Sequence, residues 1–141
     1  MAKYVSTKSK DRSTKVGCVV VGPSHEIRTT GYNGFPRYMN DDNDHRHERP
    51  AKYLYTEHAE RNAIYNAARN GIKLDGCTMY ITSFPCADCV RGIIQTGIDK
   101  VVTPDFSNQT TRIPLENYEV AKEMLYEAGV IVENTHENFT S

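Results

Sequence analysis

Two short segments of the sequence hold residues that could bind a metal ion and move protons. The first is His58-Ala59-Glu60, and the second is a Pro-Cys-x-x-Cys pattern that contains Cys86 and Cys89. One imidazole and two thiolates are ligands that suit Zn²⁺, and cysteines three residues apart on a helical turn point to the same side. Three protein ligands leave the fourth tetrahedral position for water, as in catalytic zinc sites. The two segments therefore predict a catalytic zinc held by His58, Cys86 and Cys89.

Glu60 supplies the carboxylate that such a hydrolytic site needs. It lies two residues after His58, from where its side chain could lean over the water on the metal. A carboxylate in that place can take a proton from the water and pass it to a departing amine. His-x-Glu followed by Pro-Cys-x-x-Cys is the pattern of zinc deaminases that act on cytosine or adenine. We therefore predict that Glu60 is the catalytic proton carrier.

Other roles for the Cys-x-x-Cys pair have to be weighed against this one. The pair alone could be redox-active, or it could be half of a structural zinc site, which would need a fourth ligand. The candidates for that ligand are Cys18, Cys77, His25, His45 and His47. Two of them, Cys18 and Cys77, fall in expected buried strands. The combination with His-x-Glu, in this order and on two expected helix starts, favours the catalytic site.

The composition is that of an ordinary globular chain. Its 141 residues, 38% hydrophobic and 25% charged, fit a single domain over residues 1–141. A net charge of −1 argues against nucleic acid as a partner. The sequence has no apolar signal segment and no window long enough to cross a membrane, so we expect a cytoplasmic protein with no membrane partner. In that reducing compartment the four cysteines are thiols or metal ligands rather than disulfides.

The elements that must position the two segments alternate between strands and helices. Apolar runs bounded by turn residues predict strands at 16–21, 27–32, 77–82, 100–103 and 130–132. Helical patterns predict helices at 57–70, 86–96 and 114–128. We interpret 35–56 as a long polar loop, either functional or a solvated insertion, and 134–141 as a loose tail. The alternation indicates an α/β domain with a central sheet covered on both faces.

Both chemical segments then lie at the starts of helices. A helix N-terminus presents free N–H groups and a partial positive charge. That environment stabilises a thiolate over a thiol, so it favours cysteines as metal ligands at neutral pH. The expected fold therefore agrees with the metal site that the spacing predicts.

At these residues the sequence resembles the zinc-dependent cytidine deaminase superfamily, and more narrowly its deoxycytidylate (dCMP) deaminase branch. The resemblance covers residues 9–132 and is carried by four segments: 9–17 (SKDRSTKVG), 31–36 (GYNGFP), 58–64 (HAERNAI) and 85–89 (PCADC). It implies a three-layer α/β/α fold with a central mixed sheet of about five strands. It also implies that one catalytic Zn²⁺ serves the hydrolysis of dCMP to dUMP and ammonia, which supplies dUMP for thymidylate synthesis.

Several residues are candidates for substrate binding. Arg12, Ser13 and Lys15 gather donors before a buried strand, and they form either a cradle for a monophosphate or a solvated turn. Asn33 lies in a turn that tolerates positive φ, and the resemblance implies that it also contacts the sugar of the nucleotide. The resemblance adds Ala59, and it places Phe106 where relatives often have an aromatic residue near the phosphate.

The resemblance also implies regulation. In that branch dCTP with Mg²⁺ activates and dTTP inhibits, at a site between the subunits of a homohexamer. One part of this site corresponds to Gly31, Tyr32, Asn33 and Gly34. The other part lies on the helix after Glu60, where Asn62, Asn66 and Arg69 share one side. Arg69 is either the cation for the effector phosphates or an ordinary surface arginine. Arg12 and Met39 stand where some relatives have cysteines for a second zinc, so we expect a single zinc.

Two other functions remain to be distinguished. The chain could be a zinc deaminase of another base, such as tRNA adenosine, free cytosine or cytidine, or a riboflavin precursor. It could also be an inactive relative that senses nucleotides. The net charge of −1 argues against tRNA, and the presence of Glu60 argues against an inactive relative.

Overall fold

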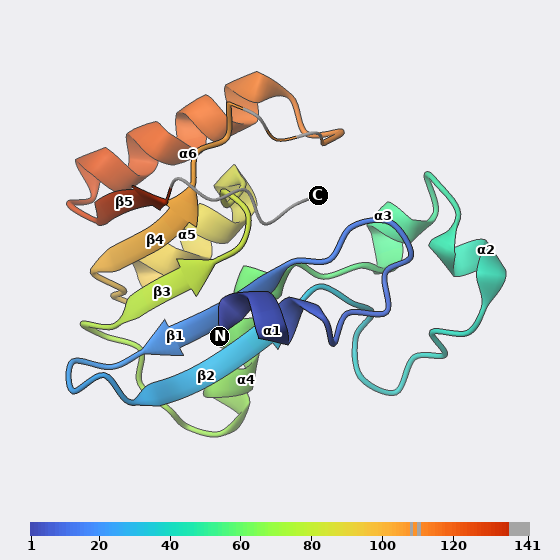
Figure 1. The fold of residues 1–141 in the computed structure, drawn as a ribbon, viewed down its shortest axis with the longest axis horizontal. Coiled ribbons are helices and arrows are strands. Elements are labelled where there is room, and N and C mark those ends of the chain that lie inside the picture. Colours follow the sequence, from blue (N-terminus) through green and yellow to red (C-terminus); the bar gives the residue numbers. More distant parts are fainter. Residues whose placement is uncertain (108, 110, 136–141) are drawn as a thin grey trace.

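The fold is built on one mixed sheet of five strands in the order β2-β1-β3-β4-β5. The computed structural model describes residues 1–107, 109 and 111–135. Strand β1 (Gly17–Val21) lies between β2 (Ile27–Tyr32) and β3 (Thr78–Ile81) and is antiparallel to both. Two further strands, β4 (Lys100–Pro104) and β5 (Ile131–Thr135), continue the sheet in parallel with β3 (Figure 1). The expected mixed sheet of five strands is confirmed.

Helices lie on both faces of this sheet. A Cβ atom at Gly17 would lie 2.1 Å from the carbonyl oxygen of Ala2, because α1 (Ala2–Ser6) crosses one face there. A Cβ atom at Gly31 would lie 2.3 Å from the carbonyl oxygen of Ala59, where α4 (Ala59–Arg69) crosses the opposite face. The absence of side chains at the two glycines therefore permits close approach of one helix to each face, and the three-layer α/β/α architecture is confirmed.

Two further helices complete the layer that contains α4. The first, α5 (Ala87–Gln95), contacts both α4 and α6 (Leu115–Glu127), and α6 also contacts β5. The core between these helices and the sheet contains the fully buried side chains of Met79, Ile93 and Leu125. Burial of a large aliphatic side chain contributes roughly 1.5–3 kcal/mol. This packing fixes the starts of α4 and α5 relative to the sheet.

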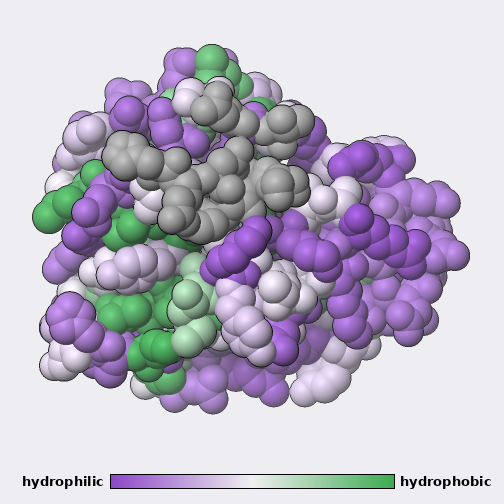
Figure 2. All heavy atoms as spheres, viewed as in Figure 1, coloured by the Kyte–Doolittle hydropathy of each residue, from purple (hydrophilic) through white to green (hydrophobic). Residues whose placement is uncertain are grey.

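The segment 35–56 is more ordered than the expected loop. It contains two short helices, α2 (Asp44–His47) and α3 (Lys52–Tyr55). The first begins where the side chain of Asn43 accepts a hydrogen bond from the N–H of His45, and the second is held by the buried Lys52. Neither helix could be predicted from apolar periodicity, because their stability comes from capping and from one buried cation rather than from an apolar stripe. Figure 1 shows this segment projecting beyond the sheet, and Figure 2 shows that its surface is hydrophilic.

The last strand extends further than expected, so the loose tail does not begin at residue 134. β5 continues to Thr135, where it pairs with Pro104, and the side chain of Asn134 donates a hydrogen bond to the carbonyl oxygen of Thr103 at 3.3 Å. Strand pairing therefore orders residues 134 and 135, which were expected to be loose; residues 136–141 lie outside the described part. In that described part, no helix is long and apolar enough to cross a membrane.

Candidate active site

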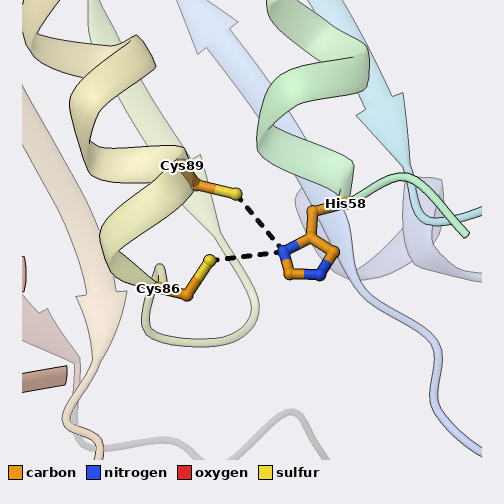
Figure 3. A group of neighbouring side chains, drawn as sticks. All are labelled: His58, Cys86 and Cys89. Atoms are coloured by element: carbon orange, nitrogen blue, oxygen red, sulfur yellow. Dashed lines mark hydrogen bonds between the residues drawn. The ribbon is translucent and has the colours of Figure 1, made fainter. Parts of the chain in front are cut away.

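The fold brings the three predicted metal ligands together at the starts of two neighbouring helices. His58 is the N-cap of α4, Cys86 is the N-cap of α5, and Cys89 lies in the first turn of α5. The Nδ1 atom of His58 lies 3.4 Å from each of the two Sγ atoms (Figure 3). The three donor atoms lie within 4.8 Å of one another. One nitrogen and two sulfur donors at this spacing fit a tetrahedral zinc ion with one position left open.

A hydrogen bond between the two cysteines places the negative charge on Cys86. A hydrogen bond from the Cys89 thiol, reinforced by His58, lowers the pKa of Cys86 to about 4. The same hydrogen bond raises the pKa of Cys89, because removing its proton would place two thiolates side by side. The hydrogen bond to Cys86 raises the pKa of His58. Cys86 is therefore a thiolate at neutral pH, ready to bind a cation, and metal binding would displace the proton of Cys89.

Glu60 lies beside this cluster and is almost completely buried, with 4% of its surface exposed. Burial raises the pKa of its carboxyl group, and the negative charge on Cys86 acts in the same direction, against the attraction of His58. A general acid–base catalyst is most effective when its pKa is close to the working pH. The site therefore places a buried carboxyl group with a raised pKa beside the three donor atoms.

A cavity of about 450 Å³ opens over the metal site. Its wall contains His58, Glu60 and Cys86, and it reaches to three cationic side chains, those of Arg49, Lys52 and Arg112. Cavities of this size hold small organic ligands. The cavity therefore extends from the predicted metal ligands to cationic side chains that can bind an anionic group.

The three cations are held by a network of contacts that begins at Asp11. The Nζ atom of Lys52 lies 3.2 Å from both carboxylate oxygens of Asp11 and donates to Ser13 Oγ at 2.8 Å. Arg49 donates to Ser13 Oγ at 3.1 Å and to the hydroxyl of Tyr53 at 2.7 Å. The guanidinium carbon of Arg112 lies 3.9 Å from the centre of the Tyr53 ring. Three cations and one contacting carboxylate leave a net formal charge of +2.

Sequence reasoning missed these three cations. Two of them, Arg49 and Lys52, lie in the segment that was interpreted as a loop, and Arg112 lies between β4 and α6. One signal was present, because Lys52 and Arg49 precede His58 by only six and nine residues. Their convergence with Arg112 depends on long-range folding, which the sequence pattern does not encode.

The predicted substrate residues divide into two groups. Ala59 and Asn33 line the cavity, and both ends of the Asn33 amide are bound to backbone, accepting from Val16 N–H and donating to Thr14 C=O at 2.8 Å each. Ser13 contacts the cations of the cavity as described above. Ser13 itself and the other three residues lie outside the cavity lining. Arg12 pairs with Asp44 at 2.8 Å, Lys15 donates to the carbonyl of Ser9, and Phe106 stacks on Tyr118 at 5.7 Å between ring centroids.

The predicted effector residues lie together on the edge of the sheet. Asn62 and Asn66 donate from α4 to the carbonyl oxygens of Tyr32 and Thr30, each at 2.8 Å. These carbonyls belong to β2, which is an edge strand, so the two amides cover unpaired backbone acceptors. Arg69 reaches the hydroxyl of Tyr38 at 3.4 Å.

The two predicted glycines flank this edge. Gly31 faces α4 at close range, and Gly34 pairs through its backbone with Glu57. Gly31 and Asn33 are buried, so the predicted effector residues do not all lie on one surface. Except for Asn33, none of them lines the cavity that contains His58.

Comparison with known proteins agrees with this site. Residues 1–104 match the family model of the cytidine and deoxycytidylate deaminase zinc-binding region. A deaminase of Aliivibrio fischeri is 42% identical over 132 residues, which cover 94% of this chain and 86% of that protein. Human deoxycytidylate deaminase is 39% identical over 100 residues, which cover 67% of this chain but only 55% of the human protein.

Solved structures agree as well. The dCMP deaminase of cyanophage S-TIM5 in its apo form has a TM-score of 0.73 and 27% identity, covering 95% of this chain and 90% of the phage chain. The same phage enzyme in complex with dCMP and dUMP has a TM-score of 0.69 and 29% identity, with coverages of 94% and 88%. With the donor set and the buried Glu60, these likenesses show that the chain belongs to the zinc-dependent cytidine and deoxycytidylate deaminase family, in its deoxycytidylate deaminase branch.

Proposed function

We propose that this protein deaminates dCMP to dUMP and ammonia, and so supplies dUMP for thymidylate synthesis. The observation that supports the monophosphate is the cavity that joins the metal site to a cationic group of net charge +2. A phosphate monoester carries a charge of about −1.5 to −2 at neutral pH, so its charge complements that of the group. Arg49 and Arg112 are not neutralised by Asp11, and their guanidinium groups suit phosphate oxygens. The dCMP complex of the phage relative is consistent with this assignment.

The chain's own residues have defined tasks in this reaction. A zinc ion held by His58, Cys86 and Cys89 would polarise water and lower its pKa towards neutrality. Glu60 accepts a proton as the oxygen of water bonds to C4 of the base, and it delivers a proton to the exocyclic nitrogen as the C4–N bond breaks and ammonia leaves. The raised pKa of Glu60 suits both directions of transfer. Burial of the carboxyl group keeps the transferred proton from bulk solvent.

A panel of substrates tests the proposed function. Purified protein is assayed for ammonia release with dCMP, deoxycytidine, CMP, cytosine and an RNA hairpin that presents adenosine. The proposal predicts the highest kcat/KM with dCMP, and a loss of at least tenfold with deoxycytidine because the phosphate contacts are missing. Equal use of deoxycytidine and dCMP would contradict the phosphate assignment. Preference for the RNA hairpin would identify a deaminase of another base.

We further propose that dCTP with Mg²⁺ activates the enzyme and that dTTP inhibits it, in a homohexamer. The side chains of Asn62, Asn66 and Arg69 support this proposal, because they place an arginine and two amide groups on α4, outside the lining of the catalytic cavity. Titration of both effectors against dCMP turnover, together with the particle mass in sedimentation, tests it. A hyperbolic response that neither nucleotide changes would contradict the proposed regulation. A particle mass below six times the 16.0 kDa of the chain would contradict the homohexamer. The cysteine ligands require a reducing compartment, which supports a cytoplasmic location.

A further inference from the structure

Tyr53 contacts two of the three cations that line the catalytic cavity. It lies on α3 and lines the same cavity. Its hydroxyl oxygen accepts a hydrogen bond from Arg49 Nε at 2.7 Å, and the guanidinium carbon of Arg112 lies 3.9 Å from the centre of its ring. The two arginines come from distant segments, one just before α3 and the other between β4 and α6. Tyr53 therefore links both segments at the cationic end of the cavity.

The Arg112 side chain depends on Tyr53 for its position. It is exposed, and within the described residues the Tyr53 ring is its only partner in a hydrogen bond, ion pair or ring contact. A contact with an aromatic ring occupies none of the N–H donors in a hydrogen bond, so all of them remain for phosphate oxygens. A long side chain that is held before the ligand arrives also loses less conformational entropy on binding.

Arg49 is held from two sides. Its Nε atom donates to the hydroxyl of Tyr53, and its Nη2 atom donates to Ser13 Oγ at 3.1 Å. The third cation, Lys52, is the one that Asp11 neutralises. Tyr53 therefore contacts the two cations of the group that remain free to neutralise a bound anion.

We propose that Tyr53 is a positioning residue for phosphate recognition, whose hydroxyl group and ring hold Arg49 and Arg112 where they bind the phosphate of the substrate. This inference rests on the proposed function, because it takes a nucleoside monophosphate as the ligand. Tyr53 acts through the two arginines and not on the reacting atoms. Its loss should therefore raise KM and leave kcat almost unchanged.

Tyr53→Leu removes the hydroxyl group and the ring together. We expect KM for dCMP to rise about 3- to 30-fold, as for a lost cation–π contact, with kcat within about twofold of wild type. The kcat/KM for deoxycytidine, which carries no phosphate, should also stay within about twofold. An equal loss with both substrates would show that Tyr53 only supports the cavity wall, and it would overturn the proposal. An unchanged KM for dCMP would overturn it as well.

A double-mutant cycle separates positioning from general damage to the fold. Tyr53→Phe and Tyr53→Leu both lack the hydroxyl group, and only Tyr53→Phe keeps the ring. With Arg112 present, KM for dCMP should be higher in Tyr53→Leu than in Tyr53→Phe. In an Arg112→Ala background the two variants should have the same KM, because the cation that the ring holds is missing. The same ratio of KM values in both backgrounds would overturn the proposal.

Tyr55 provides the matched control on the same helix. The guanidinium carbon of Arg46 lies 5.1 Å from the centre of the Tyr55 ring, but neither residue lines the cavity. Tyr55→Leu should therefore leave KM for dCMP within about twofold of wild type. A rise equal to that in Tyr53→Leu would assign the effect to α3 as a whole and overturn the proposal.

Tyr53→Phe gives an independent measurement if Tyr53→Leu fails to fold. It removes the acceptor of Arg49, and we expect KM for dCMP to rise at least about threefold. Wild-type KM in Tyr53→Phe would overturn the role of the hydroxyl group. Failure of the proposed function is seen separately, as lack of dCMP turnover in the wild-type protein.

In that case the dissociation constant of dCMP, measured by titration calorimetry, replaces KM. An increase of about threefold or more in the Tyr53 variants would support the positioning role without the reaction. An unchanged constant, or no binding of dCMP by the wild type, would overturn it.

Discussion

The ammonium group of Lys52 lies 3.2 Å from both carboxylate oxygens of Asp11, although the two residues are 41 positions apart in the chain. Both side chains are more than nine-tenths buried. Asp11 also accepts the N–H groups of Ser13 and Thr14, each at 2.9 Å. The ion pair therefore joins the first loop of the chain to α3 and supports the cationic end of the cavity.

Breaking this pair should destabilise the protein strongly. Asp11→Asn leaves Lys52 buried without its counter-charge, a change that typically costs about 3–5 kcal/mol. We expect a loss of this size in the free energy of unfolding in urea at pH 7. Asp44→Asn, which removes the exposed partner of Arg12, should cost less than about 1 kcal/mol. Equal stability of Asp11→Asn and wild type would show that the pair does not support the fold.

The same pair predicts how stability depends on pH. Burial raises the pKa of Asp11, but hydrogen bonds from Thr14, Ser13 and Lys52 outweigh it and hold the pKa below its ordinary value of 3.8. A lowered folded-state pKa contributes stability that is complete above the unfolded value and is lost as the pH falls through the folded value. The difference in unfolding free energy between wild type and Asp11→Asn, measured on metal-free protein, should therefore be constant above about pH 5 and narrow below about pH 4. A difference that grows on acidification would contradict this.

Metal content should depend on the cysteines of the cluster, such as Cys89, and not on buried cysteines outside it. Cys89→Ser removes one of three donors, and we expect the purified variant to contain much less than one equivalent of zinc by atomic absorption. Cys77→Ala is the matched control, because Cys77 is a buried thiol outside the cluster. Full zinc occupancy in Cys89→Ser would mean that the metal is held elsewhere.

Phosphate recognition should depend on Arg112 rather than on Arg12. Loss of a charge-assisted hydrogen bond typically costs 1.5–3 kcal/mol, so Arg112→Ala should lower kcat/KM for dCMP by about 10- to 100-fold and leave that for deoxycytidine almost unchanged. Arg12→Ala tests the alternative that the phosphate is bound by the loop that contains Arg12, Ser13 and Lys15, as the sequence pattern suggested. A larger loss in Arg12→Ala than in Arg112→Ala would favour the loop.

The sequence predicted most of what depends on local pattern. The five strands, the three long helices and the metal ligands all follow from apolar runs, helix starts and ligand spacing. The positions of Arg49 and Arg112 could not be predicted in this way, because Tyr53 and Ser13 bring them together from separate segments.

The role of Asn62 and Asn66 shows a different limit. Their spacing on one side of α4 was predicted, yet the structure shows their side chains bound to backbone carbonyls of β2. A sequence pattern can place residues on one face of a helix, but it does not show which acceptors that face meets. Their part in effector binding stays a prediction.

The central claim is that Glu60 moves protons at a zinc site. The most direct measurement is zinc content and dCMP turnover on the same preparation of Glu60→Gln, a variant that keeps the size of the side chain but cannot exchange protons as a carboxyl group does. We expect one equivalent of zinc, as in the wild type, and a loss in kcat of about 10²- to 10⁴-fold. Turnover within tenfold of wild type in a zinc-loaded variant would contradict it.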